Sequence, residues 1–399
     1  MKGILSSMKQ QTKKTIAAGL SVLLFFWHFS PAMAALRALP EGVEAGSSES
    51  VPAFIRAQAR PVRESKDQRI PQRQRTYALF GLIPLRTVRE APHLPVVRMG
   101  GQAVGIVLYT KGVQVVGFTT VGTYAGEQSP ASAAGLRKGD SILMVDGQAV
   151  EGASGLIASL QDREQVALTV QRGTEQLTLF LRPAMERDTN LRKLGAWVRE
   201  STSGIGTLSF LQGDRFCALG HGVADADTGF TLLADRGYIT PASVTAVLRA
   251  ETGQVGELSG EFSTKEKDAV GHIDINSSYG VAGPYTGDSD LWGREMPLAA
   301  ASQVQTGDAI LYAAVDGELK GYACKIIRLK VQSAPGIQGM MVEVSDPALI
   351  SLTGGIVPGM SGSPVVQNGR LVGVVTHVFV NEPKRGYCVY AQWMLEKLY

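Results

Sequence analysis

Cysteine is scarce in this chain, which has only three among 399 residues and no Cys-x-x-Cys pair. An odd number of widely spaced cysteines argues against a disulfide framework and against a structural zinc site. One disulfide bond remains an alternative, but free, buried thiols are the favoured expectation for Cys217, Cys324 and Cys388. The chain also lacks a His-Glu-x-x-His motif and a glycine-rich phosphate loop, so we expect no metal and no organic cofactor.

The chain also lacks a large excess of positive or negative residues. Lysine and arginine number 39 against 36 acidic residues, a formal net charge of +3, which gives no reason to expect nucleic-acid binding. A charged content of 19% and a hydrophobic content of 44% are typical of a globular protein. Forty-six glycines favour turn-rich β structure over helix bundles. The expected fold class is therefore mostly β, and the length allows two or three domains.

The sequence begins with the pattern of an export signal. Four lysines precede an apolar stretch from Ile16 to Phe29, and the small-x-small triplet Ala32-Met33-Ala34 follows. If Ala34 marks a cleavage site, the mature protein is soluble outside the cytoplasm. If it is uncut, the 22 residues from Thr15 to Leu36 can span a hydrocarbon layer of about 30 Å, with the N-terminus in the cytoplasm. Residues 1–36 are therefore predicted to be a signal peptide or membrane anchor, and the protein to be exported and membrane-associated.

Residues 37–99 have the composition of a linker and a lead-in segment. From Arg37 to Arg75 the sequence is rich in Pro, Gly, Ser, Glu and Arg and has no sustained period. Seven basic side chains lie between Arg56 and Arg75, against two acidic ones. This pattern predicts a solvated linker, with attraction to anionic lipid headgroups as the alternative.

Short strands and small helices are expected between residues 100 and 184, among them a one-turn helix that opens at Pro130 and ends at Gly135. The run from Ser129 to Gly147, S-P-A-x-x-A-G-L-x-x-G-D-x-I-L-x-V-D-G, resembles a PDZ domain. The resemblance implies a groove between a strand from Gly105 to Leu108 and a helix from Ser154 to Gln161, where a peptide, often a free C-terminus, adds as a strand. The candidate peptide-binding residues are Val104, Gly105, Ile106 and Val107.

These candidate residues depart from the G-L-G-F loop that binds a terminal carboxylate in many PDZ domains. The alternative is a PDZ fold that serves only as an internal clamp on its neighbour. After it, residues 191–399 have the length, glycine content and short strands of a trypsin-like double β-barrel.

The strongest motif for chemistry is Gly359-Met360-Ser361-Gly362-Ser363-Pro364, which resembles the G-D-S-G-G-P nucleophile loop of trypsin-like peptidases. A serine nucleophile must expose its hydroxyl while nearby backbone N–H groups converge on the developing oxyanion. Flanking glycines permit this tight backbone. We predict Ser361 as the nucleophile and the amides of Gly359 and Ser361 as the oxyanion hole, with Ser363 as the rival nucleophile.

The general base must be one of the five histidines of the chain. His221 ends the return strand of an early hairpin and precedes the serine, as the base of a trypsin-like peptidase does. His272 and His377 remain rivals. The acid is open among several aspartates between His221 and Ser361: Asp225, Asp227, Asp268, Asp274, Asp316 and Asp346. The last also has a structural explanation, as the N-cap of a helix that starts at Pro347.

The signal or anchor segment, the PDZ module ahead of the catalytic domain, and the runs C-A-L-G-H-G and G-G-I-V-x-G-M-S-G-S-P together resemble the stage IV sporulation protein B family, the sporulation signalling serine peptidases. The resemblance implies Ser361 as nucleophile, His221 as base and Asp346 as acid. It also implies self-cleavage, with the arginine-rich segment from Val51 to Arg75 as the expected region.

The same resemblance implies a partner and a location. The expected substrate is a membrane-bound inhibitor of an intramembrane metalloprotease, cut in the space between forespore and mother-cell membranes to release sigma-factor processing. Two alternatives stand beside it: a PDZ adaptor with an inert protease-like domain, and a general quality-control peptidase of the envelope. The order PDZ-then-protease argues against the second alternative.

Overall fold

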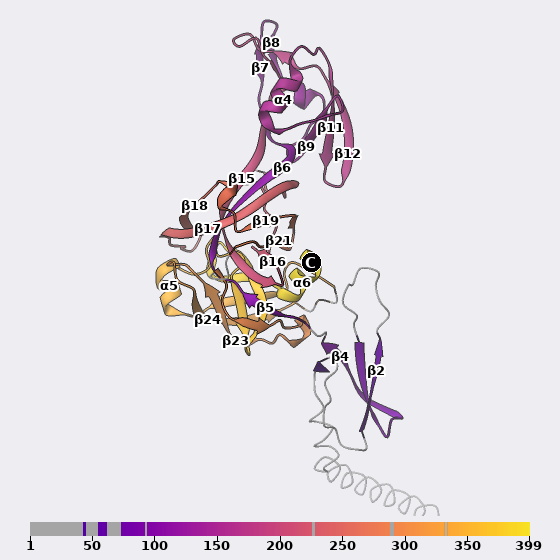
Figure 1. Cartoon of the computed structure of the whole chain (residues 1–399), viewed down its shortest axis with the longest axis vertical. Helices are drawn as coiled ribbons and strands as arrows, with labels where there is room; N and C mark the ends of the chain where they lie inside the picture. The colour runs from indigo at the N-terminus through magenta and orange to yellow at the C-terminus, as the bar shows by residue number, and fades with distance from the viewer. Residues whose placement is uncertain are drawn as a thin grey trace, which may run out of the picture. The chain divides into compact units, whose positions relative to one another are not determined.

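A computed structural model of the chain (Figure 1) describes residues 43–44, 55–61, 73–91, 94–225, 228–287, 291–330, 332 and 334–399. The chain divides into two units, Met1–His93 and Leu94–Tyr399. The predicted signal or anchor, residues 1–36, lies outside the described residues. Within the described residues, no helix has the length and apolar character needed to cross a membrane.

The first unit contains a four-stranded sheet in the order β1-β4-β3-β2. Strands β3 and β4 form a hairpin whose turn holds Phe80 and Gly81 at φ 52° and 77°, the conformation that suits tight hairpins. The expectation of an irregular linker from Arg37 to Arg75, within the linker and lead-in segment 37–99, is therefore wrong where these strands lie, because the many arginines obscured their alternation. The strands are β1 (Val43–Glu44), β2 (Ile55–Pro61), β3 (Arg73–Leu79) and β4 (Ile83–Ala91).

The second unit contains the region that matches the PDZ prediction. Its helix α3 starts at Pro130, as predicted, and α4 occupies the position predicted for the groove helix. The aliphatic residues of its strands and helices form one buried core around Val115, Ile142 and Leu168. The elements are β7 (Val121–Thr123), β8 (Gly126–Gln128), α3 (Pro130–Ala133), β9 (Ser141–Val145), β10 (Gln148–Ala149), α4 (Gly152–Leu160), β11 (Val166–Arg172), β12 (Glu175–Leu181), β13 (Ala184–Met185) and β14 (Arg192–Lys193).

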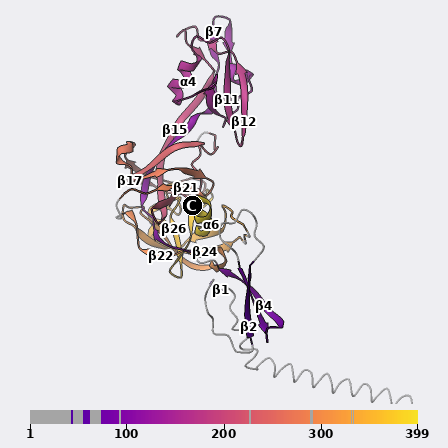
Figure 2. The same ribbon diagram turned by 45° about the vertical axis from the view of Figure 1, so that its right-hand side comes forward.

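Two long strands, β6 (Ala103–Phe118) and β15 (Ala196–Gln212), belong both to this PDZ region and to the catalytic region, the name used for the part around the predicted peptidase domain, residues 191–399. They pair with each other antiparallel from Ala196↔Phe118 to Thr207↔Ala103. The end of β6 near Val113 pairs with β9 of the PDZ core, whereas its first half also pairs with β17. Figures 1 and 2 show both strands continuing from the α4 region into the catalytic strands.

The catalytic region consists mostly of short strands, as predicted, but also contains the long strands β6, β15 and β17. Six strands close a barrel in the order β23-β24-β25-β28-β27-β26, and the remaining strands belong to the 14-stranded sheet that contains β6 and β15. The structure thus shows one closed barrel where a double barrel was predicted. It also places residues 96–110, assigned in part to the PDZ domain from sequence, in the catalytic sheet.

This catalytic sheet is built around a buried core that includes Leu108, Leu208 and Phe216. Its further elements are β5 (Val96–Met99), β16 (Arg215–Ala218), β17 (Ala234–Leu248), β18 (Glu257–Phe262), η1 (Glu266–Asp268), β19 (Gly271–Ile273), β20 (Ile275–Ser277), β21 (Gly280–Pro284), β22 (Glu295–Pro297) and η3 (Ala301–Gln303).

The closed barrel carries two helices and the last residues of the chain. Its elements are β23 (Gly307–Ala313), β24 (Lys320–Leu329), β25 (Met340–Val344), α5 (Pro347–Thr353), β26 (Pro364–Gln367), β27 (Arg370–Phe379), β28 (Glu382–Tyr390) and α6 (Ala391–Leu398). All three cysteines are free and buried, which confirms the expectation from their number and spacing.

Candidate active site

A cleft of about 600 Å³ receives the predicted nucleophile and the predicted base. His221 and Ser361 both line it, together with Gly359 and His377. Its other walls are mostly aliphatic and include Ile106, Ile205, Val223, Val255, Ile356 and Val378. Among the described residues that line this cleft there is no aspartate or glutamate. The structure therefore brings together a hydroxyl and an imidazole in largely apolar surroundings.

The nucleophile loop lies between α5 and β26, and two glycines determine its shape. Gly359 and Gly362 have φ angles of +97° and +99°, which side chains rarely adopt. A Cβ atom on Gly362 would also lie 2.2 Å from the carbonyl oxygen of Thr207. The glycines that the sequence placed on either side of Ser361 are thus required both by backbone conformation and by close packing.

Two backbone amides of this loop are available to an oxyanion. The Pro358 carbonyl accepts a hydrogen bond from the Leu258 amide and the Met360 carbonyl accepts one from the Ser363 amide, each at 3.0 Å. In a trans peptide the N–H points away from the carbonyl, so these bonds fix the direction of the following N–H groups, those of Gly359 and Ser361. Neither of these amides has a hydrogen-bond partner in the described part of the chain.

The two candidate serines differ in accessibility. The Ser361 hydroxyl faces the cleft and donates a hydrogen bond to the Thr376 carbonyl at 3.0 Å. Ser363 is fully buried, with an exposed fraction of 0%. A substrate in the cleft can reach the first hydroxyl but not the second, which favours Ser361 over its rival.

A tight turn after strand β16 places His221 in the cleft. Leu219 has a φ of +72° and the Gly220 amide donates to the Ala218 carbonyl at 3.0 Å, a three-residue turn that is uncommon and strained. Gly220 also has φ +72°, and a Cβ atom there would lie 2.7 Å from a methyl group of Val374. Packing against the barrel thus holds the strained turn that presents the imidazole.

The protonation state of His221 follows from its surroundings. Its Nδ1 lies 2.9 Å from the Gly222 carbonyl oxygen, and since a carbonyl only accepts, Nδ1 carries the proton and Nε2 is left with a lone pair. Burial lowers the pKa of His221, and the hydrogen bond to Gly222 partly offsets this effect. A neutral imidazole with an unprotonated Nε2 is the state that a general base needs.

A second histidine packs against the first. The rings of His221 and His377 are 5.1 Å apart between centroids and tilted by 39°. Burial lowers the pKa of His377, and the neighbouring His221 lowers it further. His377 therefore lines the cleft beside the candidate base, whereas the other rival, His272, is exposed on β19 and does not line it.

The loop after His221 is anchored by a residue that the sequence reasoning missed. The side chain of Asn276 accepts a hydrogen bond from the Val223 amide at 2.8 Å and donates to the Val223 carbonyl at 3.1 Å. It also donates to the Leu232 carbonyl at 3.0 Å. Asn276 belongs to no recognisable motif, so only the folded structure identifies it.

Asp346 occupies the N-cap of α5, as its local sequence predicted. One oxygen accepts hydrogen bonds from the amides of Ala348 and Leu349 at 2.9 and 3.3 Å, and the other accepts one from Ala323 at 3.1 Å. It does not line the cleft, and no hydrogen bond joins it to His221. The structure therefore explains Asp346 as a helix cap, and its assignment as the triad acid stays a prediction.

The predicted peptide-binding residues of the PDZ region are wrong. Val104, Gly105, Ile106 and Val107 pair with β15 along one edge and with β17 along the other, so no edge is open to an added strand. The segment Leu191–Val198 lies beside α4 instead, and with it forms a groove of about 470 Å³. Its run Leu194-Gly195-Ala196 has the same apolar-Gly-apolar pattern as Val104-Gly105-Ile106, which is why the sequence misled.

Comparisons with known proteins bear on both regions. The family described as SpoIVB peptidase S55 matches residues 190–395, and a PDZ domain matches residues 123–172. The mitochondrial serine protease HTRA2 of Bos taurus is 42% identical over 55 residues, which span 14% of this chain and 12% of that protein.

Two solved structures are weakly similar. The active form of the Rv3671c protease from M. tuberculosis is 17% identical, with a TM-score of 0.27 over 49% of this chain and 72% of that one. The HtrA-type protease AlgW with a decapeptide is 14% identical, with a TM-score of 0.25; the match covers 52% of this chain and 56% of that one. The assignment therefore depends on the family matches.

The class defined by these matches is a serine peptidase that carries a PDZ domain. The chain belongs to the SpoIVB peptidase S55 family, whose match covers more than half of it.

Proposed function

We propose that the chain is a serine endopeptidase with Ser361 as nucleophile and His221 as general base. The observation that carries this proposal is the meeting of the two side chains in one cleft, from loops 140 residues apart in the sequence. The unpartnered amides of Gly359 and Ser361 beside them support an oxyanion hole.

The reaction is acyl transfer. Rotation of the Ser361 hydroxyl away from the Thr376 carbonyl lets it donate to Nε2 of His221, which takes the proton as the oxygen attacks the substrate carbonyl. The tetrahedral oxyanion is held by the Gly359 and Ser361 amides. His221 then protonates the leaving amine, and water hydrolyses the acyl-enzyme with His221 again as the base.

The third member of the triad is the open element of this mechanism. In the structure the Gly222 carbonyl holds the Nδ1 proton of His221, which fixes the tautomer as a triad acid does. Asp346, which the sporulation family resemblance implies, would have to leave the α5 cap to take over this hydrogen bond.

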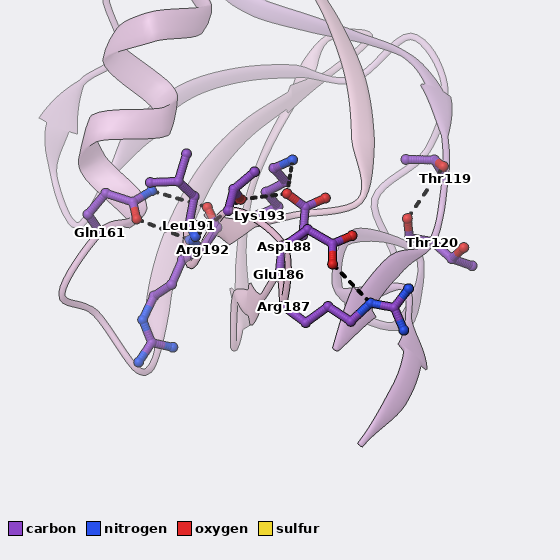
Figure 3. Close-up of polar contacts among 10 residues, drawn as sticks. Thr119, Thr120, Gln161, Glu186, Arg187, Asp188, Leu191, Arg192 and Lys193 are labelled. Carbon is purple, nitrogen blue, oxygen red and sulfur yellow. Dashed lines mark hydrogen bonds and ion pairs between the residues drawn. The ribbon is translucent and has the colours of Figure 1, made fainter. Parts of the chain in front are cut away.

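Substrate and partner follow from the two cavities. The aliphatic lining of the active-site cleft favours a substrate with an apolar side chain next to the scissile bond. The PDZ domain supports peptide binding, which we place in the groove between α4 and Leu191–Val198. The charged side chains that line it are Arg192, Lys193 and Glu186, and Lys193 is paired with Glu186 (Figure 3). The remaining positive charge, on Arg192, favours a peptide with a free C-terminal carboxylate.

The biological role that we propose is regulated proteolysis during sporulation. Membership of the SpoIVB peptidase S55 family supports this role, as does the export pattern of residues 1–36. The exported, membrane-associated enzyme would cut its own segment between Val51 and Arg75 and a membrane-bound inhibitor of an intramembrane metalloprotease, which releases sigma-factor processing.

The experiment incubates the portion from Leu36 onward, as wild type and as Ser361→Ala, and follows the N-terminal region by mass spectrometry. The proposal predicts that only wild type shortens itself between Val51 and Arg75. If neither protein shortens and neither reacts with a serine-directed fluorophosphonate, the inert PDZ adaptor becomes the better account. Broad degradation of unfolded proteins by the wild type would favour a quality-control peptidase.

A further inference from the structure

Strand β15 reaches both cavities of the second unit. Its first residues, Ala196, Trp197 and Val198, line the groove beside α4. Further along the same strand, residues 202–205 line the active-site cleft. The pairing of β15 with β6 is interrupted between these two cavities, from Arg199↔Gln114 to Ser201↔Tyr109, where four residues of β6 face one of β15. The chain of β15 itself and its side-chain contacts, and not an unbroken ladder, therefore connect the two cavities.

Helix α4 is hydrogen-bonded at its start to β15 itself and at its end to the segment that leads into β15. At its start, Glu200 Oε2 accepts a hydrogen bond from the Ala153 amide at 2.5 Å, which places a carboxylate at the positive end of the helix. At its end, the Gln161 side chain donates to the Arg192 carbonyl at 3.2 Å and accepts from the Arg192 amide at 3.0 Å (Figure 3). A change in the position of α4 would therefore displace Glu200 and Arg192, which are hydrogen-bonded to it.

At the other end of β15, Thr207 holds the nucleophile loop. Its amide donates to the Ser361 carbonyl at 3.1 Å, and its hydroxyl donates to the Gly359 carbonyl at 2.7 Å. The residue is 3% exposed, so water does not compete for these bonds. Thr207 thus fixes the two residues whose amides form the proposed oxyanion hole.

Between these ends, β15 also contacts the loop that carries His221. The guanidinium Nε of Arg199 lies 2.9 Å from Oδ2 of Asp225, whose side chain is fully buried. Asp225 follows His221 by four residues and also accepts hydrogen bonds from the amide and hydroxyl of Thr228, each at 2.9 Å. The pairing of β15 with β6 shifts register on either side of Arg199, which marks a local irregularity in the strand at this contact.

We propose that β15 couples the seating of α4 to the geometry of the active site, with Thr207 and Arg199 as positioning residues for the two catalytic loops. Thr207 acts on Ser361 and the oxyanion hole, Arg199 acts on the His221 loop through Asp225, and Glu200 links the same strand to α4. The inference depends on the proposed function, because it assigns residues that position Ser361 and His221.

The first test concerns Thr207 in the full chain. Thr207→Val keeps the size and the backbone amide but removes the hydroxyl, whereas Thr207→Ser keeps the hydroxyl. We expect the maximal rate of fluorophosphonate labelling of Ser361 to fall by roughly 10- to 100-fold in the valine variant and to stay within about threefold of wild type in the serine variant. The reagent concentration at half-maximal rate should change little, since the cleft itself is intact.

The second test is a double-variant cycle between the two ends of β15. Glu200→Ala should slow labelling several-fold in the wild-type background and have no further effect in Thr207→Val, because both changes act through the same strand. Arg163→Gln is the matched control: it breaks an ion pair with Asp146 at 2.7 Å in the same PDZ region and leaves the bonds of Glu200 and Gln161 that join α4 to β15 and its lead-in segment in place. It should leave the rate unchanged in both backgrounds.

Two results would overturn the coupling. One is a Glu200→Ala variant that labels as fast as wild type, and the other is a double variant whose loss is the product of the two single losses. Equal loss in Thr207→Val and Thr207→Ser would remove the positioning role of the hydroxyl. If wild type itself does not react at Ser361, the proposed function fails and the coupling fails with it, which is a distinct outcome.

Discussion

The Ser361 hydroxyl donates a hydrogen bond to the carbonyl of Thr376 and not to His221. The proposed nucleophile and the proposed base line the same cleft, yet among the described residues no hydrogen bond joins Ser361 to His221. The proposed reaction therefore requires the Ser361 hydroxyl to leave the Thr376 carbonyl before it can donate to His221.

The pH dependence of reaction follows from the pKa of His221. Burial lowers this pKa below its ordinary value of 6.5, and the base works only when neutral. We expect the rate of fluorophosphonate labelling at Ser361 to rise with pH along a single titration with its midpoint below 6.5 and to be constant by neutral pH. A midpoint above that value would show that His221 is stabilised in its charged form, as by an acid at Nδ1.

The two histidines also predict how stability depends on pH. Burial lowers the pKa values of both His221 and His377 in the folded chain, so below about 6.5 the unfolded chain binds more protons than the folded one. The stability that the two neutral histidines contribute is therefore fully present above their pKa in the unfolded chain, and it is lost as the pH falls below that pKa. Thermal unfolding should show a lower Tm at pH 5 than at pH 7, with a smaller difference in His377→Gln. An equal pH effect in that variant would contradict this explanation.

Gly362 and Gly369 form a matched pair for testing the nucleophile loop. Both have positive φ angles, +99° and +73°, but a Cβ atom at Gly362 meets the Thr207 carbonyl at 2.2 Å, whereas none of the surroundings of Gly369 lies within 4 Å. Each alanine variant bears backbone strain of about 1–3 kcal/mol. We expect Gly362→Ala to abolish labelling of Ser361 and Gly369→Ala to retain it, with unfolding followed by circular dichroism in both. Retained labelling in Gly362→Ala would contradict the loop geometry.

Asp346 separates a structural role from a chemical one. Asp346→Ala removes three accepted hydrogen bonds and should lower the free energy of unfolding by about 1 kcal/mol, the usual cost of losing a cap. Asp346→Asn keeps one oxygen for the amides of Ala348 and Leu349 but turns an NH2 group toward the Ala323 amide, so we expect a smaller loss of stability than in Asp346→Ala and retained labelling. A stable Asp346→Asn protein that no longer labels would establish the acid role that the family resemblance implies.

The sequence predicted those parts of the fold that depend on local pattern. The helix at Pro130, the cap at Asp346 and the glycines around Ser361 follow from backbone requirements that neighbouring residues reveal. The placement of His221 and Ser361 in one cleft was expected from a motif resemblance, and the structure places both there.

Features that depend on long-range pairing could not be predicted in the same way. Val104-Gly105-Ile106 and Leu194-Gly195-Ala196 have the same local pattern, and only strand pairing shows that the first lies between β15 and β17 while the second lies beside α4. Thr207 and Asn276 act through hydrogen bonds to backbone groups far away in the sequence, and their neighbours in the sequence carry no sign of this.

The central claim is that Ser361 is the nucleophile, and the most direct measurement maps a fluorophosphonate adduct. Wild type and Ser361→Ala are treated with the reagent at neutral pH, digested and analysed by tandem mass spectrometry. The account predicts one adduct in wild type, on Ser361, and none in the variant, because Ser363 is fully buried. An adduct on Ser363, or equal labelling of the two proteins, would contradict it.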